Sequence, residues 1–332
     1  MTPPGTAARF VLLTTLLLAA LVASVAAGAV PLSAGEVLAA LLGKGEPTAV
    51  TIVRELRLPR ALQAALVGGA LAASGAAFQA LLRNPLADPY ILGVSGGAAV
   101  GAVATIALGW AFTAGWVIPA AAFTGAGLAV MLVLRVAASV GRALDTRVLL
   151  LAGVVVGSFF NAAILLMLIL SEAESFRSAI FWMMGTLSGA SWGGLRMLAL
   201  YLLPGVLVLL ALARPLNLLT VGEETASYLG VSVERSKLLA YGAGSLLAAA
   251  AVAVSGVIGF VGLVVPHTVR MLWGGDHRFL LPASVLAGAA FLVLADTLAR
   301  VAAAPSELPV GVITAFVGVP FFVWLLRREV RR

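Results

Sequence analysis

Side chains able to do covalent or redox chemistry are scarce in this 332-residue sequence, which has two histidines and no cysteine. Without a thiol there is neither a cysteine nucleophile nor a thiolate metal site. No HExxH motif occurs, and LGKGEPT at 42–48 has the Gly and Lys of a phosphate loop without the GxxxxGK[ST] spacing. We therefore expect no enzymatic activity, no metal site, no cofactor and no ATP hydrolysis by this chain itself.

A few polar side chains are predicted to lie inside apolar segments. His267 is interpreted either as a gate or proton relay or, more commonly, as a packing histidine bonded to a backbone carbonyl. Asp296 and Arg300 are four residues apart, the spacing of an ion pair on one helix face. Asn161 and Gln79 either line a pore or, as is commoner, bridge two helices.

Two polar clusters lie between the apolar runs. Arg54, Arg57 and Arg60 precede one run. Arg300 follows another, and arginine at such helix ends commonly reaches lipid headgroups. The alternative is a docking surface for an acidic soluble protein, because guanidinium groups bind carboxylates bidentately. The second cluster, at 214–237, holds three glutamates and three basic residues, which predicts a water-exposed handle for a soluble partner.

Composition determines the elements that position these residues. The sequence is 62% hydrophobic and 11% charged, with a mean hydropathy of +1.11, whereas soluble domains carry about 25% charged residues. Its apolar runs are long and continuous, which favours membrane-spanning helices over a β-barrel. The 36 glycines allow helices to approach closely. We predict an all-α membrane protein, with residues 1–332 forming one bundle of ten spans.

Charged and Gly- or Pro-containing segments separate the spans. Residues 31–59 are expected to form a polar loop, 83–89 a break, and 178–192 an interfacial or re-entrant helix. A bend at 255–259 divides one long uncharged run. The expected spans are 10–30, 60–82, 91–109, 116–134, 148–170, 194–213, 238–256, 258–273, 279–298 and 310–326.

Basic residues predict the orientation. With the N-terminus inside, 14 of the 21 Lys and Arg residues lie on the inner side, as the positive-inside rule requires. Arg142, Arg331 and Arg332 are among them. The termini and the 214–237 segment are therefore expected in the cytoplasm. The net charge of +7 is explained by these orienting residues, so no nucleic-acid partner is expected.

Two segments share Ser, Gly, Leu and Pro at one offset. They are ASGAAFQALLRNP at 73–85 and VSGVIGFVGLVVP at 254–266. An inverted repeat, as found in many transporters, is one interpretation, and chance matching in a Gly-rich sequence is the other.

Several long motifs resemble, in order along the chain, the FecCD-type permeases of ABC importers for iron–siderophores, haem and cobalamin. The matching segments are 57–102, FWMMGTLSGASW at 181–192, GEETASYLGV at 222–231, GFVGLVVPHTVR at 259–270, DHR at 276–278 and 307–326. The resemblance covers the chain from about residue 30 to its end. It implies a type II importer fold of ten helices and a homodimer around a central pathway in a bacterial inner membrane.

The resemblance also implies partners and site residues. Two cytoplasmic ATPase subunits would bind ATP and Mg²⁺, and a periplasmic binding protein would deliver the substrate. Two short coupling helices are expected at about 216–235, where the matching residues are Gly222, Glu223, Ala226, Leu229 and Gly230. Arg57, Arg60 and Arg300 match the arginines that receive the binding protein's carboxylates. The pathway is expected along spans five and ten, with Asn161, Met167, Val310 and Thr314 as candidates.

We therefore predict the permease subunit of an ATP-driven importer of a metal chelate. Iron–siderophore or haem is the expected substrate, and cobalamin is the alternative within the same family. An ion-coupled secondary transporter is the alternative from another class. It usually needs a membrane-embedded coupling carboxylate, and no expected span has Asp or Glu at its centre.

Overall fold

The described part of the chain is helical. A computed structural model describes residues 5–140 and 145–330, without the side chains of residues 112, 326 and 328–330. Within these residues there are helices and no strands, so the all-α prediction is confirmed. Arg142, Arg331 and Arg332, three of the basic residues expected on the inner side, lie outside the described residues.

Each of the ten expected spans overlaps one helix. These helices are α1 (Thr6–Ala26), α4 (Leu58–Leu81), α5 (Val94–Ala107), α6 (Val117–Val140), α7 (Thr146–Leu170), α9 (Trp192–Ala211), α12 (Val233–Ser255), α13 (Val261–Trp273), α14 (His277–Val301) and α15 (Val310–Val330). In the described residues, seven helical segments are long and apolar enough to cross a membrane. The other three expected spans fall on α5, α13 and α15, whose apolar parts are shorter.

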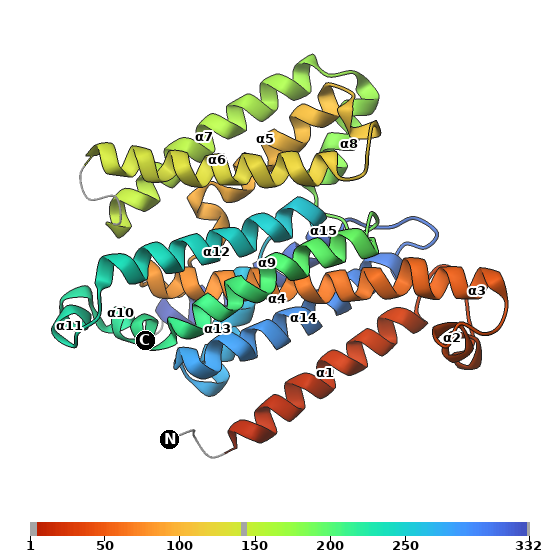
Figure 1. Ribbon diagram of the computed structural model, residues 1–332, viewed down its shortest axis with the longest axis horizontal. Helices are drawn as coiled ribbons and strands as arrows, with labels where there is room; N and C mark the ends of the chain where they lie inside the picture. The colour runs from red at the N-terminus through yellow and green to blue at the C-terminus, as the bar shows by residue number, and fades with distance from the viewer. Residues whose placement is uncertain (1–4, 141–144, 331–332) are drawn as a thin grey trace.

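The core of the bundle is built around α4, which runs between α12 and α14 (Figure 1). In their most apolar stretches, the segment containing α4 is 83% buried, α12 72% and α14 67%. The corresponding values for α1, α6, α7 and α9 are 17–22%. Large apolar side chains on these four helices face outward, as lipid-facing helices require, while α4 is enclosed by protein.

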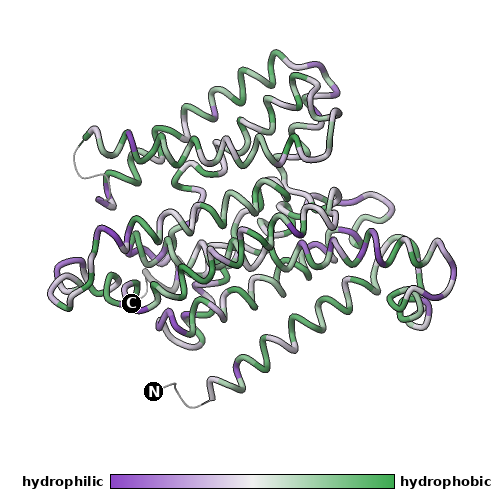
Figure 2. Tube along the Cα trace, viewed as in Figure 1, coloured by the Kyte–Doolittle hydropathy of each residue, from purple (hydrophilic) through white to green (hydrophobic). Residues whose placement is uncertain are grey.

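Polar residues gather toward the two ends of the bundle and in the connecting segments (Figure 2). One end, called the α11 end below, carries the start of α1 together with the short helices α10 (Ala213–Val221) and α11 (Glu223–Tyr228) (Figure 1). The opposite end, the α2 end, carries α2 (Ala34–Leu41) and α3 (Pro47–Thr51). The sequence predicted spans of alternating direction, with the N-terminus and the 214–237 segment on one side of the membrane. The position of the start of α1, α10 and α11 at one end of the bundle is consistent with this prediction.

The prediction of a polar loop at 31–59 was wrong. Ser33 and Glu36 form a reciprocal capping box that starts α2, and hydrogen bonds from the Ser33 side chain and backbone lower the pKa of Glu36. Pro47 begins α3, which continues through a π-helical turn at Ile52–Arg57 directly into α4. The result is one helical segment of 35 residues, Pro47–Leu81, and Arg54, Glu55 and Arg57 lie on its π-helical turn.

The short helix expected at 178–192 lies earlier in the chain. It is α8 (Ala173–Met183), and residues 184–191 form an irregular segment after it. Glu174 lies in the first turn of α8, where a negative charge favours the positive end of the helix dipole. The polar residues before the aromatic ones therefore start this helix.

The bend expected at 255–259 is confirmed, and it separates the two similar segments into different structures. Gly256 and Phe260 both have positive φ angles, 67° and 69°, which end α12 and turn the chain into α13. The segment at 73–85 continues as helix to Leu81, whereas the segment at 254–266 contains this bend. The four matching residues therefore do not mark one repeated structural unit at this offset.

Two glycines of α4 allow direct backbone contact with its neighbours. A Cβ atom built on Gly75 would lie 1.8 Å from the carbonyl oxygen of Gly262 in α13. One on Gly68 would lie 2.2 Å from the carbonyl oxygen of Gly288 in α14. Small residues at such interfaces let helix backbones touch. We call the α4–α13 and α4–α14 contacts at these positions the glycine seam.

The seam predicts opposite effects for two Gly→Ala substitutions. Gly75→Ala places a methyl group against backbone and is expected to cost about 1–3 kcal/mol or more, the usual range for overpacking. Gly127→Ala, on α6, meets no atom within 4 Å and is expected to be neutral or slightly stabilising, because alanine favours a helix. Thermal unfolding in detergent measures both. Equal unfolding temperatures for the two variants would contradict the seam.

Candidate functional site

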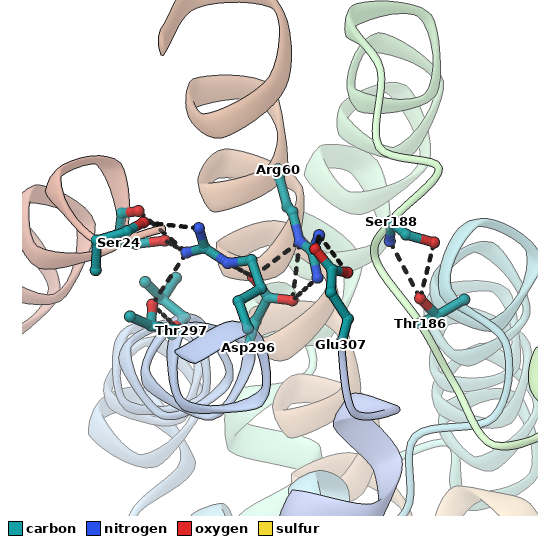
Figure 3. A network of polar contacts seen from close by, with 10 residues as sticks. Ser24, Arg60, Thr186, Ser188, Asp296, Thr297 and Glu307 are labelled. Atoms are coloured by element: carbon teal, nitrogen blue, oxygen red, sulfur yellow. Dashed lines mark hydrogen bonds and ion pairs between the residues drawn. The ribbon is translucent and has the colours of Figure 1, made fainter. Parts of the chain in front are cut away.

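A single buried carboxylate organises the α2 end. Asp296 of α14 is 0% exposed and accepts hydrogen bonds from two guanidinium groups. Its Oδ1 lies 2.9 Å from Nη2 of Arg60, on α4, and its Oδ2 lies 3.1 Å from Nε of Arg300. Figure 3 shows Arg60 and Asp296 reaching toward each other from different helices. The ion pair expected from the spacing of Asp296 and Arg300 is confirmed, and Arg60 joins it.

Each of these arginines has a further partner. Nη1 of Arg60 donates to both carboxylate oxygens of Glu307, at 3.0 and 2.9 Å, in the loop between α14 and α15. Nη1 and Nη2 of Arg300 reach α1, where they donate to the Ala27 carbonyl and to the Ser24 hydroxyl at 2.9 and 2.8 Å. The cluster therefore connects α1, α4, α14 and the last loop (Figure 3).

Arg57 differs from the other two because its described hydrogen-bond partners are backbone carbonyls. It donates to Val25 and Ala26 at the end of α1 and to Val30. Its residue is only 6% exposed, and its guanidinium lies against Gly28, where a Cβ atom would approach Nη2 to 2.6 Å. With three guanidinium groups and two carboxylates, the cluster holds one more positive than negative charge.

A cavity opens beside this cluster. It has a volume of about 350 Å³ and is lined by Gly28, Ala29, Val30, Ile52, Leu56, Arg57, Arg60, Ser188, Ala190, Arg300, Pro305 and Glu307. The three arginines expected to dock a partner thus surround one cavity at the α2 end. Arg57 and Arg300 are nearly buried and bonded inside the protein, and Arg54 is exposed. Docking by Arg57, Arg60 and Arg300 stays a prediction.

At the α11 end the expected coupling segment contains two short helices, α10 and α11. They occupy 213–228 and so begin slightly before the expected 216–235. Glu223 pairs with Lys237 of α12 at 2.9 Å and lies 3.7 Å from Arg83, in the segment after α4. Ala226 is 0% exposed, whereas Leu229 and Gly230 are exposed. Glu223 and Ala226 therefore hold α11 on the bundle.

Two exposed residues within this segment were not predicted from the sequence. Tyr228 is 90% exposed and Val221 is 71% exposed, next to Leu229 at 56%. Exposed aromatic and aliphatic side chains in a polar, water-facing segment commonly mark a protein interface. An aromatic residue in the water-exposed 214–237 segment was the signal that could have identified Tyr228. Gly222 and Gly230 have positive φ angles of 156° and 79°, which favour glycine at the ends of α11.

An apolar groove of about 580 Å³ lies between the end of α8, the bend before α13, and α15. Its lining residues are Met183, Met184, Val257, Gly259, Phe260, Gly311, Val312, Ala315, Phe316, Val319 and Pro320. Val310 and Thr314 are 2% and 0% exposed and are not among them. Asn161 is exposed on α7 and Met167 is partly buried. The assignment of these four to a pathway stays a prediction.

The remaining polar residues bridge helices. Gln79 of α4 donates to the Leu263 carbonyl at 3.1 Å and accepts from Arg270 at 2.8 Å, so the bridging interpretation holds for it. Nδ1 of His267 lies 3.3 Å from the carbonyl oxygen of Pro85, which agrees with the packing interpretation. Gln79 fastens α13 to the end of α4, and His267 fastens it to the segment that follows α4.

The burial of Asp296 between two guanidinium groups leads to a prediction about the stability of the protein. Asp296→Asn removes the charge that compensates two largely buried guanidinium groups and is expected to lower the free energy of unfolding by about 3 kcal/mol or more. Glu174→Gln, at an exposed carboxylate on α8, is the control and is expected to cost less than about 1 kcal/mol, the usual limit for an exposed charge at a helix N-terminus. Thermal unfolding in detergent compares the two, and a wild-type transition for Asp296→Asn would show that the cluster is dispensable for stability.

Comparisons with known proteins agree with the geometry. Residues 16–328 match the FecCD transport family. The cobalamin import system permease protein BtuC of Halobacterium salinarum is 48% identical, over 88% of this chain and 78% of its own length. The hemin transport system permease protein HmuU of Yersinia pestis is 44% identical, over 82% of each chain.

A solved structure shares the fold. It is described as an inward-facing conformation of a transporter assigned to the metal-chelate type of ABC transporters. It superposes with a TM-score of 0.84 and 33% sequence identity, over 95% of this chain and 97% of that chain. The family resemblance expected from the motifs is confirmed, and the chain belongs to the FecCD transport family as the membrane-spanning permease of an ABC importer.

Proposed function

We propose that two copies of this chain form the pathway of an importer that brings a bulky metal chelate across the cytoplasmic membrane. Two ATPase subunits at the α11 end, which would face the cytoplasm, bind ATP and Mg²⁺ and supply the energy. An external binding protein, periplasmic in bacteria, delivers the chelate to the α2 end. Both termini are cytoplasmic in this orientation.

The observation that carries this proposal is the exposed apolar surface of α10 and α11. Val221, Tyr228 and Leu229 project from the α11 end, although burying them would be favourable by about 25 cal/mol per Å² of apolar surface. A soluble partner that covers them satisfies this requirement. Gly222, Glu223, Ala226, Leu229 and Gly230 build the segment, with Glu223 and Ala226 anchoring it and Leu229 contacting the ATPase.

The substrate class is supported by the relatives and by the groove. Relatives are named for the import of cobalamin and hemin, and the similar structure for metal chelates. The groove formed by α8, the bend and α15 presents mostly aliphatic, aromatic and thioether groups, which suit a large ligand whose metal is already caged. Iron–siderophore and haem remain our first expectation, and cobalamin is the close alternative.

Pairing of two copies is supported by α7. Asn161 is exposed on a helix whose outward side chains are otherwise mostly apolar, and a polar amide facing lipid is unfavourable. A position facing a second copy or a hydrated pathway removes this cost. Met167 lies on the same helix. Val310 and Thr314 of α15 are buried, and they would contribute by fixing the position of α15 beside the groove.

Transport in reconstituted vesicles tests the function directly. Vesicles that hold the permease and its ATPase are supplied with the loaded binding protein. They are expected to accumulate labelled haem, ferric siderophore or cobalamin only when ATP is present on the side of the membrane where the ATPase is bound. Accumulation driven by an ion gradient without ATP would instead support a secondary transporter.

The coupling surface gives a second test. Tyr228→Ala with Leu229→Ala is expected to weaken association with the ATPase about tenfold or more, because truncating one aromatic anchor of an interface costs about 2 kcal/mol and about 1.4 kcal/mol is a tenfold change. Trp110→Ala, at a ring 57% exposed outside α10 and α11, is the matched control. Copurification and ATPase activity in detergent measure the effect. Wild-type association of the double variant would remove α11 from the interface.

A further inference from the structure

Glu307 occupies the position that an incoming carboxylate would need. Its carboxylate binds Nη1 of Arg60 from the solvent side, with the Glu307 side chain 44% exposed and that of Arg60 11% exposed. The opposite edge of the same guanidinium, through Nε and Nη2, binds Asp296, which is 0% exposed. Arg60 therefore has one buried carboxylate partner and one at the surface.

These two contacts differ in how easily they exchange. Removing one member of a buried ion pair leaves an uncompensated charge, which is strongly unfavourable. An exposed pair contributes little, because water and salt replace either partner. The contact of Arg60 with Asp296 is therefore the permanent one. The contact with Glu307 is the one that another carboxylate can replace without disturbing the cluster.

The surroundings of Glu307 permit its release. It lies in the segment between α14 and α15, where residues 304–308 are exposed. The cavity of about 350 Å³ beside it is lined by Arg57, Arg60 and Arg300 as well as by Glu307. A side chain entering this cavity meets three guanidinium groups. If Glu307 leaves, the cluster holds three positive charges and the single negative charge of Asp296.

We propose that Glu307 is a resident carboxylate that occupies Arg60 in the free permease and is replaced by one acidic side chain of the external binding protein on docking. This inference rests on the proposed function, which places that protein at the α2 end. The exchange keeps Arg60 paired at each stage. It also lowers the affinity of the site for other anions, such as lipid headgroups, because every competitor must displace Glu307.

The test uses the full-length permease in lipid nanodiscs and the importer's own external binding protein, purified and fluorescently labelled. Glu307→Gln keeps the shape of the side chain and removes its charge. It is expected to tighten binding about 2- to 5-fold, the equivalent of losing one exposed ion pair as competitor. Glu307→Asp, which shortens the reach to Arg60 by one methylene, is expected to give a smaller increase and serves if the first variant is unstable.

The control is Glu55→Gln, which also removes an exposed negative charge from the α2 end. It reports how far the loss of any negative charge at this end changes the affinity for the binding protein, an electrostatic effect that salt screens. An equal gain for Glu55→Gln and Glu307→Gln would overturn the exchange.

The outcomes separate this inference from the proposed function. If the wild-type permease binds the labelled protein and Glu307→Gln binds it equally or more weakly, docking stands and the resident carboxylate is wrong. If no variant binds it at any salt concentration, the docking proposal fails and this inference fails with it.

Discussion

The α2 end depends on one carboxylate shared between two helices. Asp296 compensates Arg60 of α4 and Arg300 of α14 at once, and Arg300 extends the contact to α1. A charge removed from water is stabilised only when it is paired and its hydrogen bonds are satisfied. The relative positions of α1, α4 and α14 at this end therefore follow from satisfying one buried anion, and the arginines that surround the cavity are oriented by the same contacts.

Local patterns in the sequence predicted the helices and the pair four residues apart, but not the contacts between distant segments. The apolar runs predicted spans that overlap the observed helices. The partnership of Arg60 with Asp296 joins residues 236 positions apart, and no spacing rule encodes it. The capping box of Ser33 and Glu36 was a readable signal, and it was missed because the segment was judged by its charged, proline and glycine residues.

For the candidate sites, the sequence named residues, and the structure shows where each of their side chains points. Glu223 and Ala226 were expected to face a partner, yet they bind the bundle, while the neighbouring Tyr228 faces outward. Val310 and Thr314 lie inside the protein beside a groove that their neighbours on α15 line. In a short or irregular element, an error of one residue in helix register changes which side chains point outward. The sequence therefore predicts the direction of a side chain less well than its place along the chain.

The glycine seam limits how this protein can change shape. The backbones of neighbouring helices touch at Gly75–Gly262 and Gly68–Gly288. These helices cannot slide or rotate past one another without a carbonyl oxygen of one helix colliding with the backbone of the other. Packed interfaces of this kind move as units. We therefore expect α4, α13 and α14 to travel as one rigid body during transport. The relative motion then falls to helices outside this unit.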